Sequence, residues 1–293
     1  MVRRARAVLT LWLLAACTSS VAPPGEQQLL ERRTPYNTVY VSQDTAGLRV
    51  LRFEPSGARQ SVVKLSDPDH LELRYTRVVP LALAFVPQPK RALIIGLGGG
   101  SIPMFLRAHF PQLRIDTVDI DPVVVEVAKS HFGFREDERV RAFVDDGRHF
   151  VEHATERYDL VVLDGFGNDG APPHLTTREF LSAVKQRLQP GGVVVSNVWG
   201  PEVNRAYASM VKTYAAVYPS VKLVEVPDAR NLVLLASTQP LDVEPEELVR
   251  RAATLTESLH LRYGLEGVAR RSLRDSKVEA GSGWVLTDEG PLP

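Results

Sequence analysis

The chain has 293 residues, 44% of them hydrophobic, which is enough to bury the core of one large domain with an extension. Lys and Arg together number 35, as do Asp and Glu, so no basic excess indicates a nucleic-acid partner. The single cysteine excludes a disulfide within the chain, and no Cys/His spacing is typical of zinc, so no metal is expected.

The first 17 residues have the pattern of a lipoprotein-type export signal. Three arginines precede an apolar segment, residues 7–16, that is too short to span a bilayer as a helix. Cys17 follows Leu-Ala-Ala, as in the bacterial lipoprotein box, and would be lipidated there; a mis-assigned start or a short buried helix is the alternative. Residues 18–33 are polar and are expected to be a tether. The sequence therefore predicts a membrane-anchored envelope lipoprotein on the periplasmic side, or a cytoplasmic protein if the signal is not used.

Residues 34–69 are expected to form a small N-terminal β-meander. Short apolar runs there are separated by the turn sequences "DTAG" and "EPSG". The next segment, 70–86, is mostly apolar and is predicted to be helical, with a kink or break at Pro80. The predicted strands of the meander are residues 36–42, 48–53 and 60–64.

From residue 92 onward, strand and helix patterns alternate strictly. This alternation predicts an α/β fold, a Rossmann-like parallel sheet with helices on both faces. The whole segment 70–293 is expected to be this one domain. Its predicted strands are 92–95, 114–119, 140–144, 159–164 and 192–197, and its predicted helices are 102–110, 122–132, 148–155 and 177–188.

The sequences "VKLVEV" and "LVLLAS" follow, joined by a tight connection with no crossover helix. They predict that the sheet ends in an antiparallel hairpin, with residues 232–237 at or next to the sheet edge. A dinucleotide-binding fold would continue with a helical crossover, so the hairpin favours the S-adenosylmethionine-type variant of the fold.

Three polar or glycine-rich sites follow three successive strands. Gly96 and Gly98 lie where the first strand turns into its helix, which lets a ligand approach the backbone closely. Asp119 ends the second strand, where a carboxylate can accept hydrogen bonds from both ribose hydroxyls. The pair Asp146-Gly147 follows the third strand, and Asp146 could accept a hydrogen bond from an adenine amine. Ordinary strand-end and turn roles are the alternatives for the two aspartates.

These motifs resemble the spermidine synthase, or polyamine aminopropyltransferase, family over residues 34–293. The resemblance implies a β-hairpin domain before the transferase domain, decarboxylated S-adenosylmethionine as donor, a small-molecule amine as acceptor, and a homodimer or tetramer. It also implies that Gln60 faces the ligand. The segments that carry it are "ARQS", "PQPKRALIIGLGGGS", "VDIDPVVVEVAKSHF", "DDGRHF", "YDLVVLDGF", "HLTTREFLSAVKQRLQPGGVVV" and "VLTDEG".

Three departures from the family pattern bear on the chemistry. An aspartate that helps to hold the donor's amine is replaced by Gly99, and the gate motif keeps only its first carboxylate, Asp164. A Tyr-His-Glu element that helps to receive the polyamine corresponds to residues 75–77, Tyr-Thr-Arg, so a cationic acceptor meets less negative charge. Asp164 is the candidate catalytic residue, as general base or amine anchor, and a buried structural aspartate is the alternative.

Three functions remain open from the sequence. The first is aminopropyl transfer to an amine. The second is methyl transfer from intact S-adenosylmethionine, which Gly99 permits because an aspartate there would repel the donor carboxylate. The third is a non-catalytic, envelope-tethered nucleoside-binding protein. No role is assigned to His174 in the loop after Asp164.

Overall fold

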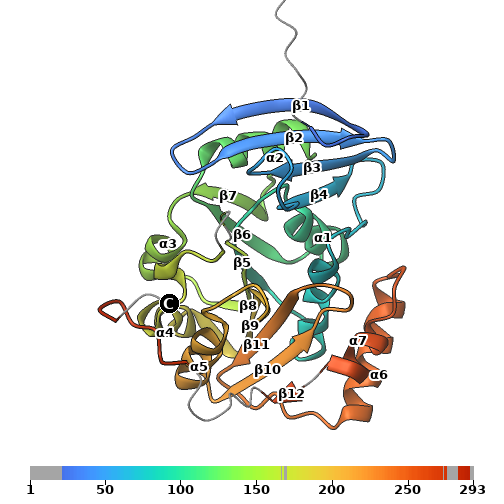
Figure 1. Ribbon diagram of the computed structural model, residues 1–293. Helices are drawn as coiled ribbons and strands as arrows, with labels where there is room; N and C mark the ends of the chain where they lie inside the picture. The colour runs from blue at the N-terminus through green and yellow to red at the C-terminus, as the bar shows by residue number, and fades with distance from the viewer. Residues whose placement is uncertain (1–21, 166, 168–169, 273, 276–282, 291–293) are drawn as a thin grey trace, which may run out of the picture.

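A computed structural model describes residues 22–293 except 166, 168–169, 273, 276–282 and 291–293, so Cys17 and the expected signal lie outside the described residues. The chain forms two sheets, of which the smaller is antiparallel and lies above the larger one in Figure 1. Its strands, in sheet order, are β1 (Glu26–Arg33), β2 (Thr38–Asp44), β3 (Leu48–Arg52) and β4 (Ser61–Lys64).

Strand β1 is a correction to the tether expected over residues 18–33. It pairs antiparallel with β2, and its side chains alternate between partly buried and exposed. The reason is a polar contact: both carboxylate oxygens of Glu26 accept hydrogen bonds from the buried Arg52, each over 2.7 Å, and the Ser42 hydroxyl donates to the same carboxylate. A fragment beginning at Thr34 would leave Arg52 buried without this partner, which is costly.

The segment predicted as a helix over 70–86 forms two short 3₁₀ helices instead, η1 (Arg74–Arg77) and η2 (Val79–Ala84). The break falls at Val78 rather than at Pro80, because Pro80 lies in the first turn of η2, where its missing N–H removes no helical hydrogen bond. All six residues of η2 are buried.

The larger sheet confirms the predicted α/β fold. Strands β7-β6-β5-β8-β9 are parallel neighbours in that order. The bounds are β5 (Arg91–Ile95), β6 (Arg114–Asp119), β7 (Val140–Val144), β8 (Tyr158–Leu163) and β9 (Leu188–Trp199).

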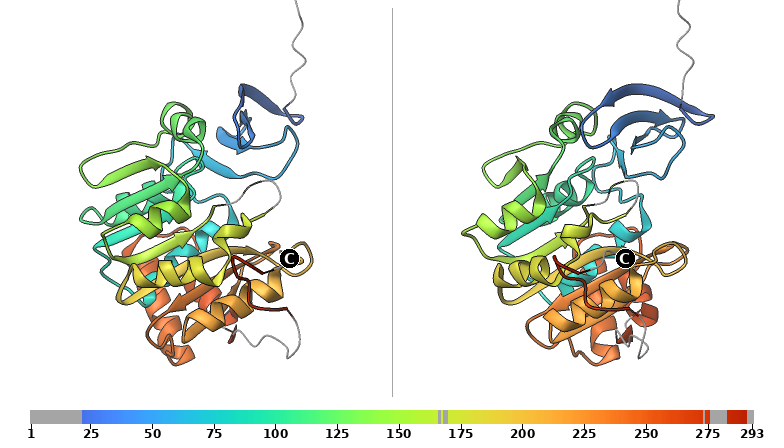
Figure 2. Two further views of the ribbon diagram at one scale, coloured as in Figure 1. Left: turned by 90° about the vertical axis from the view of Figure 1, so that its left-hand side faces the viewer. Right: turned by 60° about the vertical axis from the view of Figure 1, so that its left-hand side comes forward.

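Helices cover both faces of this sheet (Figure 2). Ile94 of β5 belongs to the core on one face, together with η2, α1, α6 and α7, whereas Leu93 and Ile95 belong to the core on the other, with α3, α4 and α5. Helix α2 also packs on the smaller sheet, through Val124 and Val127. The bounds are α1 (Ser101–His109), α2 (Pro122–His131), α3 (Gly147–His153), α4 (Arg178–Gln186), α5 (Tyr207–Val217), α6 (Pro245–Ser258) and α7 (Leu265–Ser272).

The predicted hairpin closes the sheet. Strand β11 (Asn231–Ser237) lies antiparallel to both β9 and β10 (Ser220–Glu225), as expected. It is one position further from the edge than expected, because the two-residue strand β12 (Arg274–Asp275) pairs with β10 on the outside.

The sequence patterns also missed α5, α6 and α7. No helix in the described part of the chain is both long and apolar enough to cross a membrane.

Candidate active site

The site begins at the glycine turn after β5. Gly96 has a φ of 98°, and a Cβ placed there would lie 2.3 Å from the carbonyl oxygen of Asp164. Gly191 has a similar φ of 79° but would meet nothing within 4 Å, so of these two glycines Gly96 alone is also required by a close approach of two backbones. The N–H of Asp164 donates to the carbonyl of Ile95 over 2.8 Å. The turn therefore brings the end of β8 against the end of β5.

The glycine turn also contacts the N-terminal sheet. A Cβ at Gly98 would lie 3.1 Å from Cβ of Ser61, and one at Gly99 would lie 2.6 Å from the Phe132 ring and 2.9 Å from the Ser61 hydroxyl. Gln60 immediately precedes this buried serine and is itself partly exposed. Gln60 is therefore the sequence neighbour of a residue that contacts the glycine turn, and its contact with a ligand stays a prediction.

Asp119, at the end of β6, holds the same turn from the other side. One carboxylate oxygen accepts hydrogen bonds from the N–H groups of Leu97, over 3.0 Å, and Gly98, over 3.5 Å. The other accepts from the N–H of Asp121 over 3.0 Å. Burial raises the pKa of Asp119, although these hydrogen bonds oppose the shift. The contact with Gly98 is at the limit of a hydrogen bond, so one lone pair on each carboxylate oxygen is left for a ribose hydroxyl.

Asp146 follows β7 and caps α3. Its Oδ1 accepts hydrogen bonds from the N–H groups of Arg148 and His149, and its Oδ2 lies 2.8 Å from Nε2 of His174. Burial acts to raise the pKa of Asp146, but the hydrogen bonds from His149 and His174 outweigh it and leave the pKa below its ordinary value. Asp146 is therefore held as a carboxylate, the form that accepts a hydrogen bond from an amine.

Two exposed apolar side chains border these aspartates. Ile120 follows Asp119 and is 38% exposed, and Val144 ends β7 and is 53% exposed. A planar base with its amine at Asp146 would cover such side chains. The sequence reasoning missed both, although the apolar residue directly after a strand-terminal aspartate was a usable signal. Gly147 serves close packing, since a Cβ there would lie 2.5 Å from the Ile95 side chain.

Asp164 lies at the carboxyl end of β8, between two donors. The Tyr75 hydroxyl donates to Oδ2 over 2.8 Å, and the amide of Asn197 donates to Oδ1 over 2.9 Å. Asn231 donates to the Asn197 oxygen over 2.8 Å and so orients that amide. Burial raises the pKa of Asp164 to about 6, although the two hydrogen bonds oppose the shift. Burial, and then the Asp164 charge, raise the pKa of Tyr75, so the phenol stays protonated.

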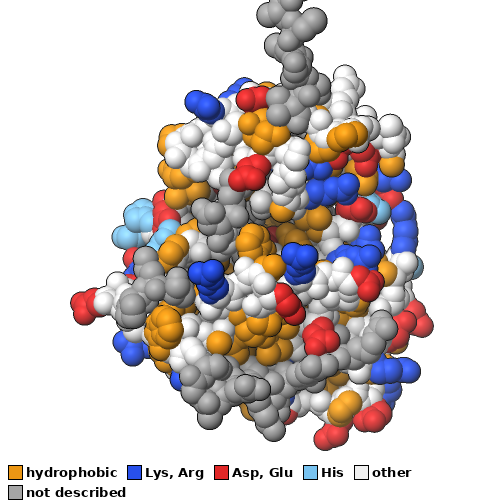
Figure 3. Space-filling model, in the orientation of Figure 1, with side chains coloured by type: hydrophobic (Ala, Val, Ile, Leu, Met, Phe, Trp, Pro, Cys, Tyr) orange, Lys and Arg blue, Asp and Glu red, His pale blue; other side chains and the backbone are white. Residues whose placement is uncertain are grey.

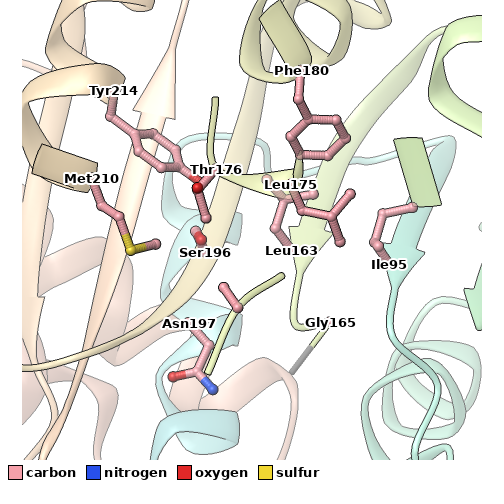
Figure 4. A pocket seen from close by; sticks show the side chains of 11 residues that line it. Ile95, Leu163, Gly165, Leu175, Thr176, Phe180, Ser196, Asn197, Met210 and Tyr214 are labelled. Atoms are coloured by element: carbon pink, nitrogen blue, oxygen red, sulfur yellow. The ribbon is translucent and has the colours of Figure 1, made fainter. Parts of the chain in front are cut away.

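A small cavity of about 20 Å³, large enough for one water molecule, is lined by Gly165, the residue after Asp164, among others (Figure 4). Its walls come from β8, β9, α4, α5 and the 3₁₀ helix η3 (Pro173–Leu175). Most of the lining is apolar, with Leu175 and Tyr214 among the side chains, while Asn197 links the cavity to the Asp164 carboxylate. In Figure 3, apolar side chains lie set back between the small sheet and the main domain.

Comparison with known proteins gives the family. The Spermine/spermidine synthase domain matches residues 72–235, more than half of the chain. The chain belongs to the spermine/spermidine synthase family. A polyamine aminopropyltransferase from Vibrio vulnificus is 31% identical over 260 residues, which cover 86% of each chain.

Two solved structures show the same fold. A probable spermidine synthase from Corynebacterium glutamicum matches with a TM-score of 0.72 and 21% identity, over 90% of this chain and 98% of that one. Human Methyltransferase-like protein 13, in complex with SAH, matches with a TM-score of 0.60 and 27% identity, over 66% of this chain and 95% of that one. The chain is therefore similar to a methyltransferase as well as to spermidine synthases.

Two arginines of η1 make polar contacts with neighbouring segments. Arg74 donates to the Asp228 carboxylate over 2.7 Å, which joins η1 to the turn between β10 and β11. Arg77 donates to the Leu71 carbonyl and lies 3.7 Å from the Glu72 carboxylate. Positions 168 and 169, in the loop that the family resemblance compares with a gate, lie outside the described residues. No group of three or more His, Cys, Asp or Glu side chains placed to hold a metal ion occurs among the residues described.

Proposed function

We propose that the protein transfers the aminopropyl group of decarboxylated S-adenosylmethionine to a small-molecule amine. The observation that carries this proposal is Asp164, a partly buried carboxylate with a pKa of about 6 that is oriented by Tyr75 and Asn197 and directly contacts the glycine turn through its backbone. A base with a pKa near neutrality is suited to take a proton from an acceptor amine at neutral pH.

In this reaction the donor's nucleoside binds along the carboxyl ends of β5, β6 and β7. Its ribose hydroxyls donate to Asp119, and its exocyclic amine donates to Asp146. The acceptor nitrogen forms a bond to the carbon beside the sulfonium, the carbon–sulfur bond breaks, and its electron pair remains on sulfur in a neutral thioether nucleoside. The proton that the nitrogen loses passes to Asp164. No metal is needed for this displacement.

Methyl transfer from intact S-adenosylmethionine is the second candidate, and position 99 favours it. The Phe132 ring and the Ser61 hydroxyl occupy the space that a side chain at position 99 would need. Position 99 therefore presents no carboxylate to the amino acid end of the donor. A donor carboxylate would therefore meet no repulsion there. The likeness to a methyltransferase structure at 27% identity supports the same candidate.

The two reactions release different products, which gives a direct test. The full chain is incubated with decarboxylated or intact S-adenosylmethionine and a panel of diamines and monoamines, and the thioether nucleosides are separated chromatographically. We expect methylthioadenosine to form only when decarboxylated donor and an amine are both present. Formation of S-adenosylhomocysteine alone would replace the proposal with methyl transfer. Calorimetric binding of nucleoside without either product would favour the non-catalytic binding protein.

We also propose that the protein is an envelope lipoprotein anchored through Cys17. The proposal rests on the position of the chain's only cysteine after a short apolar segment with basic residues before it. Cys17→Ser is expected to abolish metabolic labelling with a fatty acid and to move the protein from the membrane to the soluble fraction, whereas the control Ser19→Ala changes neither. Recovery of the native protein in the cytosol with Met1 intact would contradict the anchor.

A further inference from the structure

His174 contacts Asp146, one of the residues proposed to bind the nucleoside. It lies on η3, between Asp164 and α4, and its Nε2 is 2.8 Å from Oδ2 of Asp146. An ionised carboxylate only accepts hydrogen bonds, so Nε2 carries the proton and donates. The capping of α3 uses Oδ1 of Asp146 alone. The contact with His174 is therefore not needed to begin the helix.

The same contact positions η3 over the strand ends. Leu175, the neighbour of His174, lines the small cavity together with Ile95. A Cβ at Gly165 would lie 3.5 Å from both of these side chains, so η3 is in van der Waals reach of the loop that follows Asp164. Through His174, this segment is joined to Asp146 at the start of α3.

The carboxylate of Asp146 has room for one more donor. Its two oxygens offer about four lone-pair positions, of which the two backbone N–H groups and His174 use three. The remaining position is on Oδ2, beside His174. An exocyclic amine can therefore bind without displacing the histidine.

We propose that His174 is a positioning residue for base recognition: its hydrogen bond fixes the free lone pair of Asp146 toward the exocyclic amine and keeps η3 against the bound nucleoside. This inference rests on the proposed function, because it requires a nucleoside at Asp146. It gives His174 a role in affinity and in discrimination of the base, with no part in the transfer itself.

The test measures calorimetric affinity of the full chain for methylthioadenosine and for its analogue with hydrogen in place of the exocyclic amine. The variants are His174→Ala, His174→Gln, which retains a donor, and the control His153→Ala, whose ring lies on α3 and contacts the His149 carbonyl instead. We expect His174→Ala to weaken methylthioadenosine binding about tenfold and analogue binding less than twofold. His174→Gln should stay within about threefold of wild type for both, and His153→Ala should match wild type.

A purely structural role for His174 would weaken both ligands equally, and that result would overturn the inference, as would wild-type affinity in His174→Ala. Thermal unfolding of each variant shows whether the fold is kept. If the wild type binds methylthioadenosine but His174→Ala is unchanged, only this inference fails. If the wild type binds neither ligand, the proposed function fails and the inference fails with it.

Discussion

Asp164→Asn is expected to lower the rate of group transfer by about 100-fold or more while changing donor affinity less than about twofold. The substitution retains the shape of the side chain. Its single oxygen can accept from Asn197, and the Tyr75 hydroxyl can turn to accept from the new amide, so the local hydrogen bonds survive. What is lost is the basic group that takes the proton of the acceptor amine.

Single-turnover kinetics together with calorimetry of the donor would separate these two effects. Asp159→Asn is the matched control, because Asp159 lies on the same strand at its opposite end and accepts from the N–H groups of Lys90 and Arg91. That variant should transfer at the wild-type rate. Normal turnover by Asp164→Asn would remove Asp164 from the chemistry, and a large loss of donor affinity would place it on the donor side instead.

The raised pKa of Asp164 adds a pH dependence to both activity and stability. As a base it must be ionised, so the transfer rate should fall as pH decreases through about 6, and Asp164→Asn should lack this limb. A carboxyl whose pKa is raised in the folded state favours folding in its protonated form, and this contribution is lost as pH rises from about 4 through about 6. Above pH 6, Asp164→Asn should therefore be more stable than wild type, by about 1–3 kcal/mol.

The sequence predicted the part of the site that follows directly from strand ends. Asp119, Asp146 and Asp164 each come at the end of a parallel strand, and such ends meet at one edge of a sheet, so their grouping followed from the α/β alternation. The partners of Asp164 could not be found in this way. Asn197 lies within β9 and Asn231 begins β11, and nothing in the alternation marks an amide inside a strand as a site residue.

Strand β1 was missed for a related reason. Its sequence, EQQLLERR, is polar, and a polar segment after the expected signal reads as a tether unless its charged groups have partners elsewhere. Glu26 finds that partner in Arg52, 26 residues away, and no local pattern encodes such a pairing.

The absence of an acid at position 99 was visible in the sequence. The sequence does not show that Phe132 and Ser61 occupy the space where a side chain at position 99 would lie. Phe132 follows the end of α2, and only the folded chain places it next to Gly99.

Asp119→Ala is expected to weaken nucleoside binding at least tenfold. Two ribose hydroxyls donate to an ionised acceptor in the proposed complex, and each such hydrogen bond contributes roughly 1.5–3 kcal/mol where water is excluded.

The same substitution leaves the N–H groups of Leu97, Gly98 and Asp121 without their acceptor, so the glycine turn loses its support as well. Each buried donor left unsatisfied costs about 1–3 kcal/mol, which removal of a buried charge offsets in part.

Asp119→Asn separates the two roles in part, because its remaining oxygen can still accept from Leu97 and Gly98, whereas its amide nitrogen can accept neither from Asp121 nor from ribose. We expect it to recover part of the unfolding free energy and little of the nucleoside affinity, by denaturant titration and calorimetry respectively. Asp116→Asn is the control on the same strand, since Asp116 lies in the first half of β6, accepts from Tyr158 and should leave nucleoside affinity unchanged. If Asp119→Ala binds the nucleoside with wild-type affinity, the ribose hydroxyls do not bind this carboxylate. The alanine variant has no side-chain oxygen to accept their hydrogen bonds.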